Sequence, residues 1–110
     1  MTSRKRRSLL LAGAAGAFLM VTAPTAEAAT YYPVAPGHRV NVRSGPGTSY
    51  PIVRVLPEGA RVPIHCQTPG TTVSGPYGTS NIWDSIDNGE FISDTYVKTG
   101  SDGYVAPRCG

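Results

Sequence analysis

The sequence predicts a small all-β barrel, and three observations predict it. Short apolar stretches whose residues alternate between two faces recur along the chain, as at 40–43. Runs rich in Gly, Pro and Ser, such as 44–49, separate these stretches and cannot continue a strand. No longer segment has helical periodicity. Short strands joined by tight turns in a chain of this length favour a small barrel of antiparallel strands.

The strands of the first half are expected between clear turn signals. Residues 29–36 form a lead-in that is compatible with a first strand or with a disordered tail. Strands are then expected at 40–43 and over the β-branched run 52–56. After the turn at 57–59, a further strand places Val62, Ile64 and Cys66 on one face.

The second half begins with a segment, 67–80, that is rich in Gly, Thr, Ser and Pro. We expect it to form a long loop or a loose hairpin, with 71–74 as its extended part, and loops of this length are often functional or mobile. The Asp-Asn-Gly sequence at 87–89 is a strong hairpin turn signal. The remaining expected elements are strands at 81–86, 91–92, 96–97 and 104–106, with one helical or tight turn at 93–95.

The order of motifs in the first half resembles that of bacterial SH3-type (SH3b) domains. It consists of an Asn-Val-Arg strand at 41–43, a Ser-Gly-Pro loop at 44–46, a Ser-Tyr-Pro step at 49–51 and a Leu-Pro-x-Gly turn at 56–59. The second half resembles the family more loosely. It has a Trp-x-x-apolar strand beginning at Trp83, a turn with a glycine, and an aromatic-apolar strand.

The resemblance implies an SH3-like barrel with its core at about 38–98. The chain departs from the simple family pattern in its long segment 67–80 and in a C-terminal extension, 99–110, that carries the second cysteine. We interpret the extension as an added tail that a disulfide staples to the strand ending at Cys66. Long-segment versions with paired cysteines look like small secreted proteins of actinobacteria.

The N-terminus has the features of an export signal. Four basic residues at 4–7 precede an apolar run at 9–21, and Ala26-Glu27-Ala28 fits the rule for signal cleavage. We therefore predict a signal peptide at 1–28 and a single exported domain at 29–110. The apolar run is too short for a membrane anchor, so no membrane span is expected after cleavage. The predicted location is secreted, either free or associated with the cell wall, and paired arginines in the basic segment are also compatible with a twin-arginine route.

The basic character of the chain belongs to this N-terminal segment. The whole sequence has a formal net charge of +3 at pH 7. Without residues 1–28, basic and acidic side chains are equal in number. A nucleic-acid partner therefore loses its main compositional support.

The two cysteines, Cys66 and Cys109, both lie in the predicted exported part. Exported proteins meet oxidising conditions, so a disulfide between the two is expected. The alternative is a nucleophilic Cys66 activated by His65. It is disfavoured because adjacent strand residues point to opposite faces.

The sequence lacks the residue patterns of common catalytic and metal sites, so we expect no enzyme activity, no cofactor and no metal. His38 and His65 are its two histidines, and neither has the spacing of a hydrolytic zinc site. No Gly-x-Ser-x-Gly elbow is present. Four carboxylates lie close in sequence and would allow a catalytic pair, but we expect solvated turn residues that oppose strand aggregation. They are Asp84, Asp87, Glu90 and Asp94.

Aromatic residues beside Gly and Pro suggest a shallow recognition groove for an extended peptide or a sugar face. In SH3b relatives that bind cell walls, such a groove takes up peptide stems or cross-bridges of peptidoglycan. The resemblance places candidate ligand contacts at Asn41, Ser49 and Tyr50, with Trp83 as a wall. Tyr77, in the long segment after Gly75-Pro76, is the aromatic residue for which we most expect exposure.

Structural roles compete with these assignments. Trp83, Phe91 and Tyr96 are expected in the core, and Asn41 and Arg43 can serve only to bond neighbouring loops. The expected function is a non-catalytic exported module that recognises peptidoglycan or its peptide stems. The alternative is a secreted domain that binds or inhibits another exported protein.

Overall fold

A computed structural model describes residues 30–110, so the predicted signal peptide lies outside the described residues. Within them, strands and one short 3-10 helix are the only regular elements, which confirms the predicted all-β class. In chain order they are β1 (Tyr31–Pro33), β2 (Val40–Arg43), β3 (Ile52–Leu56), β4 (Arg61–Pro63), β5 (Cys66–Gly75), β6 (Gly78–Asp87), β7 (Glu90–Ser93) and the 3-10 helix η3 (Asp94–Tyr96).

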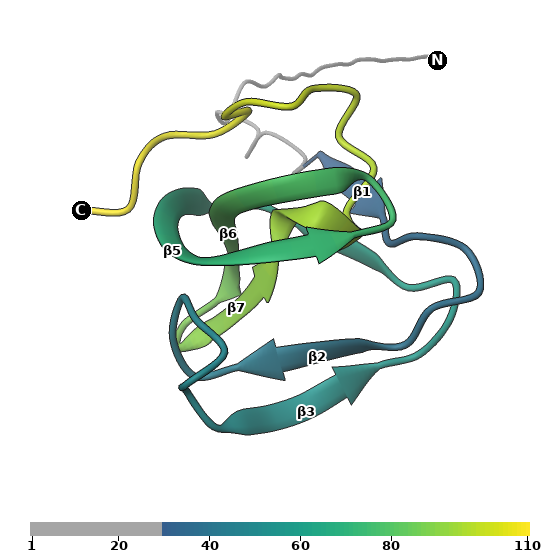
Figure 1. The fold of residues 1–110 in the computed structure, drawn as a ribbon, viewed down its shortest axis with the longest axis horizontal. Helices are drawn as coiled ribbons and strands as arrows, with labels where there is room; N and C mark the ends of the chain where they lie inside the picture. The colour runs from purple at the N-terminus through teal and green to yellow at the C-terminus, as the bar shows by residue number, and fades with distance from the viewer. Residues whose placement is uncertain (1–29) are drawn as a thin grey trace, which may run out of the picture.

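The strands form two open antiparallel sheets. β1 pairs with β4, and the other strands follow the order β3-β2-β7-β6-β5. A bridge between Val34 and Val97 joins the segment after β1 to the segment after η3. Figure 1 shows the β2–β3 hairpin at one end of the fold and the β5–β6 hairpin at the other, with β7 between them. The segment 29–36, for which a first strand and a disordered tail were both compatible with the sequence, therefore contains strand β1.

One small core lies between the two sheets. Its buried members are mostly β-branched side chains on the inward faces of the strands, and Tyr32, Ala60, Ile64 and Tyr96 pack against it. They are Val34, Val40, Val42, Leu56, Val62, Ile86, Ile92 and Val97. Trp83 is also buried, as expected, whereas Phe91 is half-buried at the margin.

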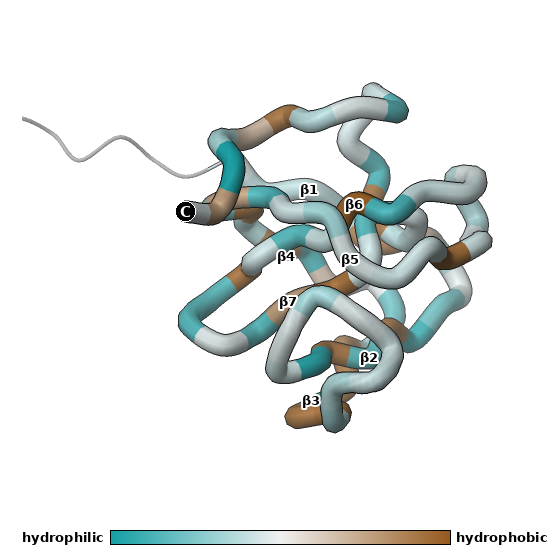
Figure 2. Tube along the Cα trace, turned by 60° about the vertical axis from the view of Figure 1, so that its left-hand side comes forward, coloured by the Kyte–Doolittle hydropathy of each residue, from teal (hydrophilic) through white to brown (hydrophobic). Residues whose placement is uncertain are grey.

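Strand β3 contributes little to this core, although four of its five residues are apolar. Ile52, Val53 and Val55 remain 48%, 49% and 39% exposed, and Leu56 alone is buried. The reason is position, because β3 is an edge strand of the five-stranded sheet. The surface apolar residues of β3 are visible in Figure 2.

The segment 67–80 forms a hairpin, which is one of the two forms expected for it. β5 and β6 pair from Cys66 opposite Ser85 to Gly75 opposite Gly78, with one irregularity between Pro69 and Val73. The β-branched residues here favour extended backbone, and the irregularity accommodates Pro69, which has no N–H to donate. Gly78, at the turn between β5 and β6, has a φ of 115°, a backbone conformation that residues with a side chain rarely adopt.

Two further predicted strands are absent from the described chain. Tyr96 ends η3, and Val97 makes only the single bridge to Val34. The segment 104–106 is not a strand, because its backbone N–H groups bond to a side chain. Val105 N and Ala106 N donate to Gln67 Oε1 at 2.6 and 2.9 Å.

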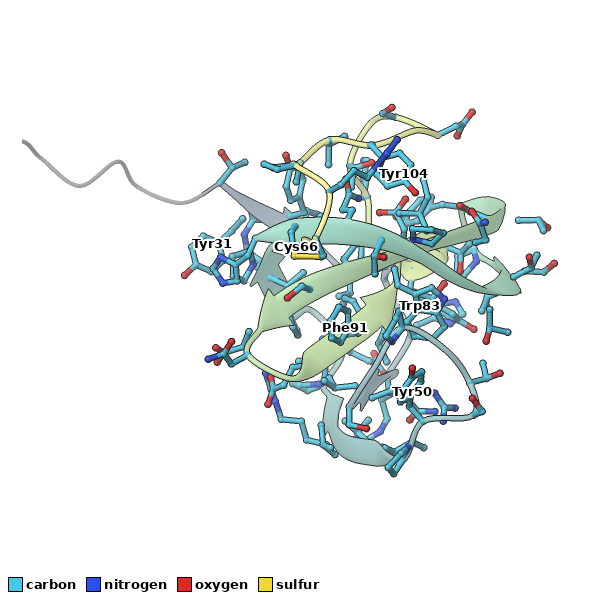
Figure 3. The ribbon with its side chains drawn as sticks, turned by 90° about the vertical axis from the view of Figure 1, so that its left-hand side faces the viewer. Tyr31, Tyr50, Cys66, Trp83, Phe91 and Tyr104 are labelled. Carbon is cyan, nitrogen blue, oxygen red and sulfur yellow. A yellow bond between two sulfur atoms is a disulfide. The ribbon has the colours of Figure 1, made fainter. Side chains whose placement is uncertain are left out.

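The C-terminal tail is held along β5 around Gln67, which is completely buried. Gln67 N donates to Pro107 O at 2.8 Å, and Cys109 N donates to Gln67 O at 2.9 Å. The predicted Cys66–Cys109 disulfide is present beside these bonds (Figure 3), with the two Cα atoms 4.9 Å apart. The stapled extension is therefore confirmed, although Cys66 begins β5 and does not end the expected preceding strand, which stops at Pro63. The extension covers the edge of β5 with hydrogen bonds as well as a covalent link.

We expect removal of this disulfide to lower the melting temperature substantially. The link closes a loop across 43 residues, for which the loss of chain entropy in the unfolded state is worth about 4 kcal/mol. For a domain of this size the Tm of a Cys66→Ala/Cys109→Ala variant should fall by more than about 10 °C. Calorimetry on the oxidised protein and the double variant measures the difference. An unchanged transition, with two titratable thiols in the native wild-type protein, would contradict the staple.

Candidate functional site

A groove of about 160 Å³ lies where β2, the β5–β6 hairpin and η3 meet. Asn41 enters it from β2, Trp83 from β6 and Tyr96 from η3. We call it the Trp83 groove. The residues that define it are Arg39, Asn41, Thr48, Val73, Trp83 and Tyr96.

Trp83 is the fixed wall of the groove. Its indole Nε1 donates to the Thr71 carbonyl oxygen at 2.8 Å, and only 2% of the residue is exposed. A Cβ on Gly70 would come within 2.8 Å of the Trp83 ring and would overlap the Pro46 carbonyl oxygen. The absence of a side chain at Gly70 therefore lets β5, the indole and the 44–50 loop pack closely together. Trp83 is both a buried residue and a groove wall.

The loop 44–50 is docked onto β2 and β5. Arg43 Nη1 donates to the carbonyl oxygens of Thr48 and Tyr50 at 3.1 and 2.9 Å. Thr48 N donates to Thr71 Oγ1 at 3.2 Å. The Tyr50 ring lies against Gly45, where a Cβ would collide with it. Arg43 therefore has the loop-bonding role that was one of its two expected roles.

The structure separates the predicted ligand contacts into three places. Asn41 and Trp83 share the groove. Ser49 and Tyr50 are exposed on the adjoining loop, as Figure 3 shows for Tyr50. Tyr77, 40% exposed, lies at the tip of the β5–β6 hairpin and lines a different cleft beside the C-terminal tail. A single site that includes Tyr77 is therefore not formed.

Sequence reasoning missed Arg39 and Val73 as groove residues and assigned Tyr96 to the core alone. Arg39 is exposed, and within residues 30–110 it makes no recorded ion pair, since the ion pair found there joins Arg54 and Glu90. Tyr96 packs on the core and meets the His38 ring edge to face at 5.8 Å. The proximity of Arg39 to the Asn-Val-Arg motif was the signal available for finding it.

Two of the four clustered carboxylates are buried, which corrects the expectation of solvated turn residues. Asp84 is fully buried and Asp94 is 6% exposed. Asp87 is exposed at the hairpin turn as expected, while Glu90 is half-buried and accepts bonds from Arg54. The end of β6 is buried on both faces from Ile82 to Ile86, and Asp84 lies within this stretch. Asp94 is the first residue of η3 and lies near it.

Gln67 joins the two buried carboxyl groups. Its Nε2 donates to Asp84 Oδ1 at 2.7 Å and lies 3.4 Å from Asp94 Oδ1. Burial raises the pKa of Asp84 to about 9, the neighbouring Asp94 adds to the rise, and the Gln67 bond opposes it. Burial also raises the pKa of Asp94, and the hydrogen bond from Asp84 opposes that rise. Asp84 therefore keeps its proton at neutral pH.

The protonated state of Asp84 explains an otherwise unsatisfied atom. Asp84 Oδ2 is buried and receives no hydrogen bond from a donor among the described residues. As an O–H group it can donate to Asp94, so the pair needs no catalytic explanation. Within residues 30–110, no group of three or more His, Cys, Asp or Glu side chains could hold a metal ion.

We expect Asp84→Asn to change how stability depends on pH. The folded-state pKa of Asp84, about 9, lies above the ordinary 3.8, so the folded state binds the extra proton and stability falls as pH rises between these values. An Asn retains an oxygen for Gln67 and an N–H for Asp94. The variant should be more stable than wild type at pH 8 to 9, with the difference shrinking toward pH 4. Denaturant unfolding across this range measures it.

The exposed Asp102→Asn change is the control for this experiment, because it removes a carboxylate that is not buried. Its unfolding curve should follow the wild type at every pH. Parallel pH profiles for the wild type and Asp84→Asn would show that Asp84 does not hold a proton in the folded state.

Comparison with known proteins gives matches over most of the chain. The family model described as bacterial SH3 domain matches residues 38–109. Two proteins of Bacillus subtilis (strain 168), uncharacterized protein YraI and uncharacterized protein YraJ, are 49% and 47% identical over 119 residues. The first match covers 99% of this chain and 98% of YraI, and the second covers 99% of each. The likeness to actinobacterial proteins stays a prediction.

Proposed function

Because the chain belongs to the bacterial SH3 domain family, we propose that it is a non-catalytic, exported binding module whose Trp83 groove binds a peptide of cell-wall peptidoglycan. Bacterial SH3 domains are modules that bind proteins or peptidoglycan, which leaves the particular ligand to be argued from the groove. No helix within residues 30–110 is long and apolar enough to cross a membrane.

The observation that carries the proposal is that the groove combines aromatic walls with polar side chains that make no hydrogen bond within residues 30–110. Trp83 and Tyr96 supply rigid walls, while Asn41 and Arg39 make no recorded side-chain hydrogen bond within residues 30–110. An amide that both donates and accepts suits the backbone of an extended peptide. A guanidinium suits a carboxylate, which peptide stems carry. The groove thus offers shape and polarity for a peptide more than for an uncharged sugar.

The buried acid pair supports a non-catalytic role. Gln67 and the protonated Asp84 hold the Asp94 carboxylate within a structural network. His65 is exposed, and its neighbour Cys66 is in the disulfide, so the pair cannot supply a thiolate. Binding without turnover is the activity that these side chains favour.

An extracellular location is compatible with the disulfide and with the family. The predicted signal peptide at 1–28, outside the described residues, supports secretion. Retention at the cell wall would follow from binding by the groove. These elements together favour a protein that acts outside the cytoplasm.

The experiment is co-sedimentation of the oxidised protein, residues 29–110, with purified peptidoglycan sacculi across a range of salt concentrations. Loss of a hydrogen bond to a charged ligand costs about 1.5–3 kcal/mol, so Arg39→Ala should weaken retention by at least about tenfold. Asn41→Ala should weaken it by a smaller factor, and Tyr50→Ala reports on the adjoining loop. Asn88→Ala, in the β6–β7 turn away from the groove, is the matched control and should bind as wild type does.

Two outcomes would overturn the proposal in different ways. Absence of wild-type retention at every salt concentration would remove peptidoglycan as the ligand. Unchanged retention of both Arg39→Ala and Asn41→Ala would move binding away from the Trp83 groove.

A second candidate function, binding of another exported protein, is favoured by the exposed edge strand β3. Ile52, Val53 and Val55 are large apolar side chains left in solvent. The outer edge of β3 has no paired strand in the five-stranded sheet, and such an edge can add a strand from a partner. Figure 2 shows this apolar strand at the surface of the fold.

A Val53→Thr/Val55→Thr variant tests this candidate, because threonine keeps β-branching and removes apolar surface. If β3 is the docking surface, one exported protein should co-purify with wild type and with Asn41→Ala, and should be lost from the double variant. Equal recovery with the double variant would exclude β3.

A further inference from the structure

A second recess, on a different part of the molecule from the Trp83 groove, lies between the β5–β6 hairpin tip, η3 and the loop that starts the C-terminal tail. Its volume is about 350 Å³. Figure 1 shows the tail passing over the β5–β6 hairpin, so the recess exists only because the tail is held there. We call it the tail cleft. Its defining residues are Tyr77, Thr79, Ser80, Asp94, Ser101 and Asp102.

The cleft is acidic and rich in hydroxyl groups. Asp94 forms part of its wall from η3, and Asp102 stands on the tail. Ser80 and Ser101 already accept bonds from Ile82 N and Gly103 N, at 3.0 Å each, so their positions are fixed by the backbone. Tyr77, which is 40% exposed, adds apolar surface. The recess therefore combines negative charge with walls that suit a hydrocarbon chain.

The Asp94 carboxyl group has no cationic partner among residues 30–110. The residue is 6% exposed, and the one recorded bond to its carboxylate is from the Gln67 amide at 3.4 Å. The protonated Asp84 supplies a second hydrogen bond, yet a carboxylate offers about four acceptor positions. The ion pair found within residues 30–110 is between Arg54 and Glu90, so no cation of the described chain compensates Asp94. A buried charge without a partner is costly, and a cationic ligand would relieve that cost.

Lys98 is the cation nearest in sequence and lines the outer continuation of the cleft, together with Asp102. It does not line the recess around Asp94, and its backbone N–H is bonded to Pro33 O at 3.0 Å. A ligand cation at Asp94 would therefore feel attraction from Asp94 and Asp102 and repulsion from Lys98. The opposite signs of these effects provide a test.

We propose that the tail cleft binds the side-chain ammonium group of a lysine or a related diamino acid in a peptide. The ammonium group donates to Asp94 and Asp102, and the methylene stem lies along Tyr77. An organic cation suits the cleft better than a metal ion, since hard cations take six or more oxygen ligands and no metal-holding group of side chains exists within residues 30–110. The interaction does not depend on what the Trp83 groove binds.

The test is an NMR titration of the ¹⁵N-labelled oxidised protein at pH 7 with Nα-acetyl-L-lysine methylamide. Its matched probe is Nα-acetyl-L-norleucine methylamide, which has the same stem without the ammonium group. The lysine compound should give saturable amide shifts at Thr79, Ser80, Thr95 and Ser101. The norleucine compound should leave these amides unchanged at the same concentration.

Charge variants locate the interaction. Asp102→Asn should weaken binding by up to about fivefold, because an exposed ion pair is worth up to about 1 kcal/mol. Lys98→Gln, a change of opposite sign on the same tail, should bind the lysine compound as tightly as wild type or more tightly. Asp94→Asn should abolish the shifts, and its spectrum shows directly whether the fold is retained.

Equal shifts with the lysine and norleucine compounds would overturn the proposal, because recognition would then not involve the ammonium group. The proposal would also be overturned if Lys98→Gln weakened binding of the lysine compound and Asp102→Asn had no effect on it. This comparison remains valid even if Asp94→Asn fails to fold. No cell-wall material enters this experiment, so its failure is distinguishable from failure of the peptidoglycan proposal.

Discussion

The buried side chain of Gln67 is the interaction on which the rest of the structure depends. An amide both accepts and donates, and Gln67 uses both ends: its oxygen receives the N–H groups of Val105 and Ala106, and its nitrogen faces Asp84 and Asp94. One residue thereby links β5, β6, η3 and the C-terminal tail. Loss of the amide would leave buried donors and acceptors of several segments unsatisfied, which costs more than the bonds contribute when formed.

The neighbouring disulfide and the Gln67 bonds act on different states of the chain. The Cys66–Cys109 link restricts the unfolded chain, which is how a small domain with a limited core gains stability. The Gln67 bonds act in the folded state, where they set how the tail lies along β5. The tail cleft follows from this second effect, because its outer wall is the tail itself. A stabilising extension therefore also creates a recessed, charged surface that the core strands alone do not form.

Close backbone approach has a comparable role at the Trp83 groove. Gly70 permits contact between β5 and the Pro46 carbonyl, and Trp83 is fixed by its bond to Thr71. Arg43 is used to hold the 44–50 loop, which leaves Arg39 as the groove cation without an ion pair in the described chain. The two recesses thus differ in their ionisable groups: within residues 30–110, the groove has the Arg39 guanidinium without an ion pair, and the cleft has the carboxyl groups of Asp94 and Asp102. Ligands of opposite charge would select between them.

The all-β class, strands β2 and β3 and the pairing of Cys66 with Cys109 were predictable from the sequence, because alternation, turn chemistry and cysteine count are local or compositional signals. The same signals left 67–80 open between a long loop and a loose hairpin, and they could not show that the apolar face of β3 stays in solvent. Burial of Asp84 and Asp94 depends on Gln67, 17 and 27 residues away in the chain. The sequence by itself determined which residues could form strands and a staple. Only the tertiary structure decided which polar groups meet, because the contacts that bury a carboxyl group join residues that are far apart in the sequence. The distance between Tyr77 and Trp83 in the fold is likewise not evident from their spacing in the sequence.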